Sequence, residues 1–172
     1  MVEKTVKIVV AGDGGVGKTS FLNRLVYDNF DLNSELTKGV DFFSKSILIN
    51  ETDINFVMWD FAGQEQFKSL LDGFAEGSMA AFLLFDLTRV STIENVVTWL
   101  GKLKKLPNMP IIILGTKYDM LENKFESSID KYLMSLVESN NLLRYMKISS
   151  KTGYNIKEVF HELIDMLSSV KV

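Results

Sequence analysis

VKIVVAGDGGVGKT, residues 6–19, joins an apolar run to a glycine-rich loop. Residues 6–11 are apolar apart from one lysine, which is typical of a strand buried on both faces of a sheet. Residues 12–19 fit the spacing G-x-x-x-x-G-K-[ST], in which glycines let successive backbone N–H groups point at one anion. Lys18 adds a positive charge, and the hydroxyl of Thr19 can bind magnesium. The stretch therefore predicts a strand, a phosphate-binding loop and a helix that begins near Lys18.

A glycine-rich turn that merely connects a strand to a helix is the alternative interpretation of residues 12–17. The context favours phosphate binding, because the motif follows an apolar strand and precedes an amphipathic segment containing Phe21, Leu22, Leu25 and Val26. A phosphate loop alone does not distinguish ATPases, nucleotide kinases and GTPases.

The remaining apolar runs indicate the fold class. Residues 54–59, 80–85 and 111–114 are continuous runs, which favour a mostly parallel sheet covered on both faces. Residues 42–49 alternate instead and lead into a turn, which predicts a hairpin with an antiparallel edge strand. Helices are expected at about 18–28, 66–76 and 126–139, and after capping-box patterns that start at Ser91 and Asn155. Together these elements predict one α/β domain over residues 1–172, with a doubly wound, mostly parallel six-stranded sheet, one antiparallel edge strand and helices on both faces. With the phosphate-loop motif after its first strand, this is expected to be a P-loop NTPase fold.

Composition narrows the class of protein. The chain has 172 residues, of which 47% are hydrophobic and 24% charged, as in soluble globular proteins. Its net charge of −3 argues against nucleic acid as a partner. It has no cysteine, which excludes disulfides, thiolate metal sites and prenylation within this sequence. Because no window approaches the length of a membrane span, we expect a cytoplasmic monomer, or a peripheral membrane protein if a lipidated tail is missing from the sequence.

Three downstream segments bear on the choice of nucleotide. They are Thr37-Lys38-Gly39-Val40-Asp41-Phe42, Trp59-Asp60-Phe61-Ala62-Gly63-Gln64-Glu65 and Thr116-Lys117-Tyr118-Asp119. In this order, and with the phosphate loop, they resemble the T-I-G-V-D-F, W-D-T-A-G-Q-E and N/T-K-x-D motifs of the Ras-superfamily small GTPases, and most closely those of the Rab-type subgroup. The resemblance spans nearly the whole chain.

The resemblance implies that GTP and GDP are the ligands and Mg²⁺ the cofactor. Thr19 and Thr37 would ligate the metal through their hydroxyl groups, and Asp60 would do so through a water. Lys18 and Gln64 would be the catalytic residues, one holding the phosphates and the other orienting the attacking water. Taken without the resemblance, residues 37–42 are a plain loop that enters an edge strand, and Asp60 is an ordinary carboxylate at a strand end.

Guanine would be selected by Asp119, because its carboxylate can accept two hydrogen bonds from guanine that adenine cannot supply. Phe30 would lie across the base, the stem of Lys117 would stack on it, and Ser149-Ser150-Lys151 resembles the S-A-K segment of the family. The residues predicted to bind the nucleotide are Gly12, Asp13, Gly14, Gly15, Val16, Gly17, Lys18, Thr19, Ser20, Phe30, Thr37, Gly63, Thr116, Lys117, Asp119, Ser149, Ser150 and Lys151.

The sequence departs from the family pattern at three positions. Ser34 replaces a tyrosine that closes over the phosphates in many relatives, so the nucleotide should be less covered. Phe61 replaces the usual threonine and should change the packing or the rate of the second switch. Thr116 replaces the commoner asparagine, and we expect a weaker contact to the phosphate loop. Trp99 and His161 are interpreted as a packing residue and a helix-surface residue.

The resemblance implies a molecular switch that hydrolyses GTP to GDP and regulates signalling or vesicle traffic. Its exchange factor, activating protein and effectors would bind around residues 32–42 and 61–76. The arginines Arg24, Arg89 and Arg144 lie outside both segments, so we expect slow intrinsic hydrolysis and an arginine finger supplied by a partner. Two alternatives stay open: a pseudo-GTPase scaffold that binds nucleotide without hydrolysing it, and a P-loop ATPase.

Overall fold

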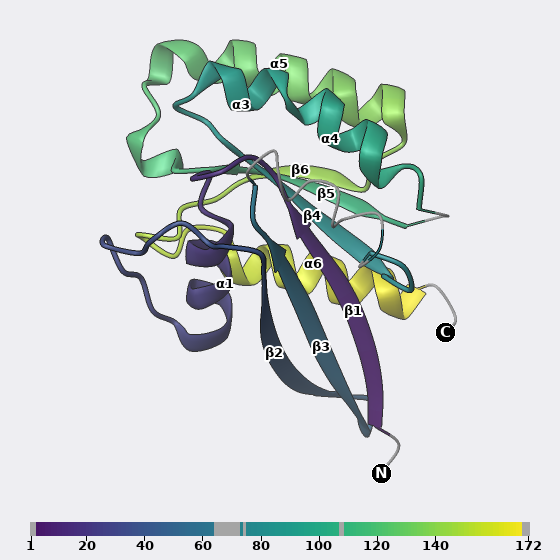
Figure 1. Cartoon of the computed structure of the whole chain (residues 1–172). Coiled ribbons are helices and arrows are strands. Elements are labelled where there is room, and N and C mark those ends of the chain that lie inside the picture. The colour runs from purple at the N-terminus through teal and green to yellow at the C-terminus, as the bar shows by residue number, and fades with distance from the viewer. Residues whose placement is uncertain (1–2, 64–72, 74, 107–108, 170–172) are drawn as a thin grey trace.

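The computed structural model describes residues 3–63, 73, 75–106 and 109–169. Strands and helices alternate along most of the chain (Figure 1). The strands are β1 (Glu3–Ala11), β2 (Val40–Ile49), β3 (Thr52–Phe61), β4 (Ala80–Asp86), β5 (Ile111–Thr116) and β6 (Arg144–Lys147). The helices are α1 (Lys18–Tyr27), α3 (Val90–Glu94), α4 (Val96–Leu103), α5 (Asn123–Asn140) and α6 (Ile156–Ser169), with a 3₁₀ turn η2 (Tyr118–Met120). The helix predicted at 66–76 falls mainly on residues outside this description.

The six strands form one sheet in the order β2-β3-β1-β4-β5-β6. Strand β1 pairs in parallel with β3 and β4, whereas β2 runs antiparallel to β3 at the edge. Asn50 and Glu51, which connect β2 to β3, both have positive φ, as a two-residue type I′ hairpin turn requires. The structure therefore confirms the predicted fold, including the direction of the edge strand.

Helices cover both faces of the sheet, because the side chains of the buried strands alternate between two hydrophobic clusters. On β1, Ile8 and Val10 belong to the cluster that includes residues of α1 and α6, whereas Val9 and Ala11 belong to the cluster with residues of α3, α4 and α5. Figure 1 shows the same division, with α1 and α6 on one side of the sheet and α3, α4 and α5 on the other.

The two capping-box predictions have different outcomes. The one at Ser91 is wrong, because α3 already begins at Val90 after Arg89, and the hydroxyl of Thr92 bonds the backbone of Asp86 and Arg89 instead. Asn155 does directly precede α6, but its side-chain amide donates to the carbonyl oxygen of the last β6 residue at 3.0 Å.

No helix in the described part of the chain has both the length and the apolar character of a bilayer span.

Candidate functional site

A cavity of about 350 Å³ lies where the loops after β1, β3 and β5 meet. Carboxyl ends of parallel strands are the usual place for a ligand site in an open α/β sheet. Most of the residues predicted to bind a nucleotide line this cavity: Gly14, Gly15, Val16, Gly17, Lys18, Thr19, Ser20, Phe30, Thr37, Gly63, Thr116, Lys117, Asp119, Ser150 and Lys151. Gly12, Asp13 and Ser149 are absent from the lining and contact Lys18 or Asp119 behind it. Gln64 lies outside the described residues, so its role stays a prediction.

Two glycines allow the loop after β1 to pack closely against neighbouring backbone. Gly12 has a φ of 139°, and a Cβ there would lie 2.1 Å from the carbonyl oxygen of Leu84. A Cβ on Gly63, just after β3, would lie 2.4 Å from the backbone nitrogen of Gly14. Side chains at either position would push the backbone apart, so the loop and the segment after β3 are held in direct contact.

Lys18 is the buried cation of the site. It is the first residue of α1, it is 6% exposed, and its ammonium donates to the carbonyl oxygens of Gly12 at 3.0 Å and Asp13 at 2.9 Å. Burial lowers the pKa of Lys18 to about 8, although the carboxylates of Asp60 and Asp13 oppose that shift. Because an ammonium has three donors, the group can still offer a hydrogen bond to an anion in the cavity.

Three oxygens from distant segments meet beside this lysine. The hydroxyl of Thr19 donates to Asp60 Oδ2 at 2.5 Å, and it lies 2.6 Å from the hydroxyl of Thr37. Asp60, at the end of β3, is completely buried, and within the described residues its Oδ1 has no hydrogen-bond partner. Burial raises the pKa of Asp60, and the hydrogen bond from Thr19 and the charge of Lys18 oppose the rise.

This oxygen set fits a small hard cation such as Mg²⁺, which prefers hydroxyl, carboxylate and phosphate oxygens. A buried carboxylate with one unpaired oxygen also needs a partner, because leaving it without one is costly. The described residues contain no group of three or more His, Cys, Asp or Glu side chains that could hold a metal ion. A cation here would therefore depend on oxygens from a bound ligand as well.

Asp119 is held from behind by the loop that follows β6. Ser149, itself buried, donates its hydroxyl to Asp119 Oδ1 at 2.6 Å. The hydroxyl of Thr116 donates to the carbonyl oxygen of Val16 at 2.6 Å, so residue 116 does contact the loop after β1. These contacts present the Asp119 carboxylate to the cavity as an acceptor of hydrogen bonds.

The segment before β2 supplies one wall of the cavity. Phe30, Ser34 and Thr37 line it. Leu32 and Leu36 line it as well, but they remain 78% and 58% exposed. A wall whose apolar side chains are this exposed is open to further contacts with a ligand or a partner.

Phe61 does not line the cavity. Its ring is fully buried in the cluster under α3 and α4, and it stacks on Trp59 with ring centroids 6.5 Å apart. The phenyl ring that replaces the usual threonine therefore packs in the hydrophobic core, which explains how it fits beside the second predicted switch.

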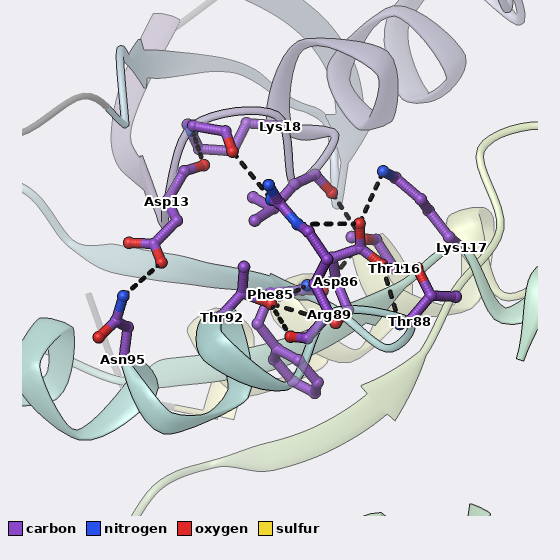
Figure 2. A network of polar contacts seen from close by, with 12 residues as sticks. Asp13, Lys18, Phe85, Asp86, Thr88, Arg89, Thr92, Asn95, Thr116 and Lys117 are labelled. Carbon is purple, nitrogen blue, oxygen red and sulfur yellow. Dashed lines mark hydrogen bonds and ion pairs between the residues drawn. The ribbon is translucent and has the colours of Figure 1, made fainter. Parts of the chain in front are cut away.

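Sequence reasoning missed a network on the outer side of the phosphate loop (Figure 2). The carboxylate of Asp13 accepts hydrogen bonds from Asn95 Nδ2 at 2.7 Å and from Trp99 Nε1 at 2.8 Å, so Trp99 does more than pack. Arg89 donates to the carbonyl oxygen of Gly14 at 2.9 Å. Asp86 ends an apolar strand, as Asp60 nearly does, but it belongs to none of the motifs that the sequence offers.

The chain is similar to known proteins over nearly its whole length. The family model described as "Ras family" matches residues 7–169. Two proteins of Arabidopsis thaliana, "Ras-related protein RABF2a" and "Ras-related protein RABF2b", are 34% and 35% identical over 167 residues, which is 96% of this chain and 82% of each relative. "Ras-related protein RABA1c" of the same organism is 32% identical over 166 residues, 95% of this chain and 76% of the relative.

Proposed function

This chain belongs to the Ras family, and on that premise we propose that it is a Rab-like molecular switch that binds GTP with Mg²⁺ and slowly hydrolyses it to GDP. The observation that carries the proposal is one cavity lined both by Lys18 and by Asp119. A buried ammonium suits the phosphate groups, and a carboxylate acceptor suits the two donors on the guanine edge.

The phosphate end of the ligand would be held by charge and by backbone amides. Lys18 would donate to the phosphate oxygens, and the N-terminus of α1, which begins at the same residue, would add its positive dipole end. The ammonium of Lys18 is held in place without a ligand, because it donates to two loop carbonyls. The N-terminus of α1 is fixed with it, because the helix begins at this residue. Such preorganised donors stabilise the charge that develops during phosphoryl transfer.

Mg²⁺, when bound, would neutralise negative charge on the phosphate oxygens. Thr19 and Thr37 would hold it through their hydroxyls, and Asp60 would do so through a water. These three side chains are already within hydrogen-bond distance of one another, so little rearrangement is needed to form the site.

The switch would depend on two segments, one that contacts Thr19 in the first turn of α1 and one that contacts the loop after β1. Thr37, before β2, and Gly63, after β3, would both lose a partner when the γ-phosphate leaves, and the segments would relax. We propose that exchange factor, activating protein and effectors bind residues 32–42 and 61–76, where Leu32, Leu36 and Phe42 are exposed apolar side chains. The monomeric state, and a location in the cytoplasm or at a membrane surface, stay predictions.

Hydrolysis itself is tested by a single turnover. Protein loaded with GTP and Mg²⁺ should convert it to GDP at about 10⁻⁴ to 10⁻³ per second, the range of a small GTPase without its activating protein. Chromatography of the extracted nucleotide measures this rate, and Gln64→Leu should bind GTP normally but hydrolyse it more slowly. Failure to form GDP would identify a pseudo-GTPase scaffold, and a rate of about 1 per second would contradict the need for a partner's arginine.

The affinity for GDP should depend on pH through Lys18. In the free protein its pKa is about 8, and a bound phosphate would raise it. Above that pKa the free protein must take up a proton to bind, so the dissociation constant should rise, by up to about tenfold per pH unit. Below it, Lys18 is already charged and should add nothing further to the pH dependence.

Titrations with GDP on both sides of this pKa measure the effect. Lys18→Met is the matched control, because it removes the titrating group and should abolish the rise. A dissociation constant that is equally flat in the wild-type chain would show that Lys18 does not charge on binding.

A further inference from the structure

Arg89 holds the phosphate loop from outside the cavity. It lies between β4 and α3, and its Nη2 donates to the carbonyl oxygen of Gly14 at 2.9 Å. Its Nε lies 3.4 Å from Asp86 Oδ2. Figure 2 shows the guanidinium between the loop and this carboxylate.

Asp86 is a rigid anchor for that arginine. Its side chain is 1% exposed, its Oδ1 accepts from the backbone N–H and hydroxyl of Thr88, and its Oδ2 is 2.7 Å from the ammonium of Lys117. Burial alone would raise the pKa of Asp86, but the hydrogen bonds from Lys117 and Thr88 outweigh it and lower the pKa, so the carboxylate stays ionised. The same anion thus fixes Arg89 at the phosphate loop and Lys117 at the predicted base site.

The hydrogen bond to the Gly14 carbonyl also affects the N–H of Gly15, which belongs to the same peptide unit. In a trans peptide the C=O and the next N–H point in opposite directions, and the described chain contains no cis bond. With the Gly14 carbonyl turned to Arg89, the N–H of Gly15 is turned away from it. A hydrogen bond accepted by the carbonyl also makes the linked N–H a better donor.

Both residues of this peptide line the cavity, whereas Arg89 does not. A Cβ placed on Gly15 would lie 3.9 Å from both terminal nitrogens of the guanidinium. The arginine therefore lies beside the loop, outside the cavity that the Gly14–Gly15 peptide lines.

We propose that Arg89 is a positioning residue for GTP hydrolysis, which orients and polarises the Gly15 N–H as a donor to the phosphates through its bond to the Gly14 carbonyl. The inference rests on the proposed function, since it assumes phosphates in this cavity. The inference assigns a role to Arg89 although this residue lies outside both predicted switch segments. A partner can still supply a separate arginine directly to the ligand.

The loop has a second anchor that allows a clean test. The Asp13 carboxylate is held by Asn95 and Trp99 independently of Arg89, so removing the guanidinium should leave the loop in place. Arg89→Ala removes the donor, and Arg89→Lys retains a charged donor. Arg144→Ala is the matched control, because Arg144 pairs with Glu162 on β6 and α6, away from the loop.

The primary measurement is the Gly15 amide resonance of the GDP-bound protein in ¹⁵N–¹H correlation spectra. Arg89→Ala should shift the Gly15 proton upfield, because its hydrogen bond weakens, and Arg89→Lys should restore part of the shift. Single-turnover hydrolysis should fall about tenfold in Arg89→Ala, whereas the affinity for GDP should change less than threefold. Arg144→Ala should change none of these values.

Two results would overturn the inference: a Gly15 resonance unchanged by Arg89→Ala, or losses of GDP affinity and of hydrolysis that are equal, which would make Arg89 a purely structural residue. A wild-type chain that binds GDP but does not hydrolyse GTP would sink the proposed function instead. The two failures remain distinguishable, because the resonance is measured with GDP and needs no turnover.

Discussion

Replacing Asp119 by Asn is expected to lower the affinity for GTP by roughly a thousandfold, because a matched pair of hydrogen bonds to the base is exchanged for a mismatched one. The Asp119 carboxylate, held by Ser149 at 2.6 Å, can accept from two guanine donors. An asparagine amide presents one acceptor and one donor, and the donor meets the guanine amine. Xanthine carries a carbonyl in place of that amine, so the variant should gain affinity for xanthosine triphosphate.

Displacement of a fluorescent guanine nucleotide by GTP and by xanthosine triphosphate measures both effects. Asp165→Asn, at an exposed position on α6, is the matched control and should retain the wild-type order. If Asp119→Asn keeps the wild-type preference, Asp119 is not the residue that reads the base.

Replacing Lys18 by Met should lower the affinity for both GTP and GDP by about a hundredfold to a thousandfold, since a buried ion pair with phosphate is lost. The methionine retains an apolar stem in the space that the lysine occupies. The free energy of unfolding of the nucleotide-free protein should change much less than the affinity. The variant leaves the carbonyl oxygens of Gly12 and Asp13 without a donor, which is destabilising, but it also removes a buried charge, which is stabilising. We expect these two effects to offset each other largely in the nucleotide-free protein.

Calorimetric titration and thermal unfolding of the nucleotide-free protein separate the two effects. Lys131→Met, on the exposed face of α5, is the control for a lost positive charge and should bind both nucleotides like the wild type. A Lys18→Met variant that is fully folded and binds GTP normally would remove Lys18 from the site.

Much of the fold was predictable because it depends on local patterns. Continuous apolar runs indicate the buried strands, and alternation in residues 42–49 indicates the antiparallel edge strand. The phosphate loop was predictable for a similar reason, since its glycines and Lys18 act within eight consecutive residues. The starts of α1 and α6 followed from residues directly beside them.

The network around Arg89 was not predictable, because its partners are far apart in sequence. Arg89 reaches Gly14 across 75 positions and Trp99 reaches Asp13 across 86. Side chains such as these carry no periodic signal, and the arginine looked unremarkable as one of three. The buried position of Phe61 was equally hidden, because the motif suggested a switch residue whereas the ring completes the core under α3 and α4.

The choice between guanine and adenine is tested most directly by calorimetric titration of nucleotide-free protein with GDP and with ADP in the presence of Mg²⁺. We predict that GDP binds at least about a thousandfold more tightly than ADP, because only guanine satisfies the Asp119 carboxylate. Equal affinities, or tighter binding of ADP, would contradict the assignment of this cavity as a GTP site.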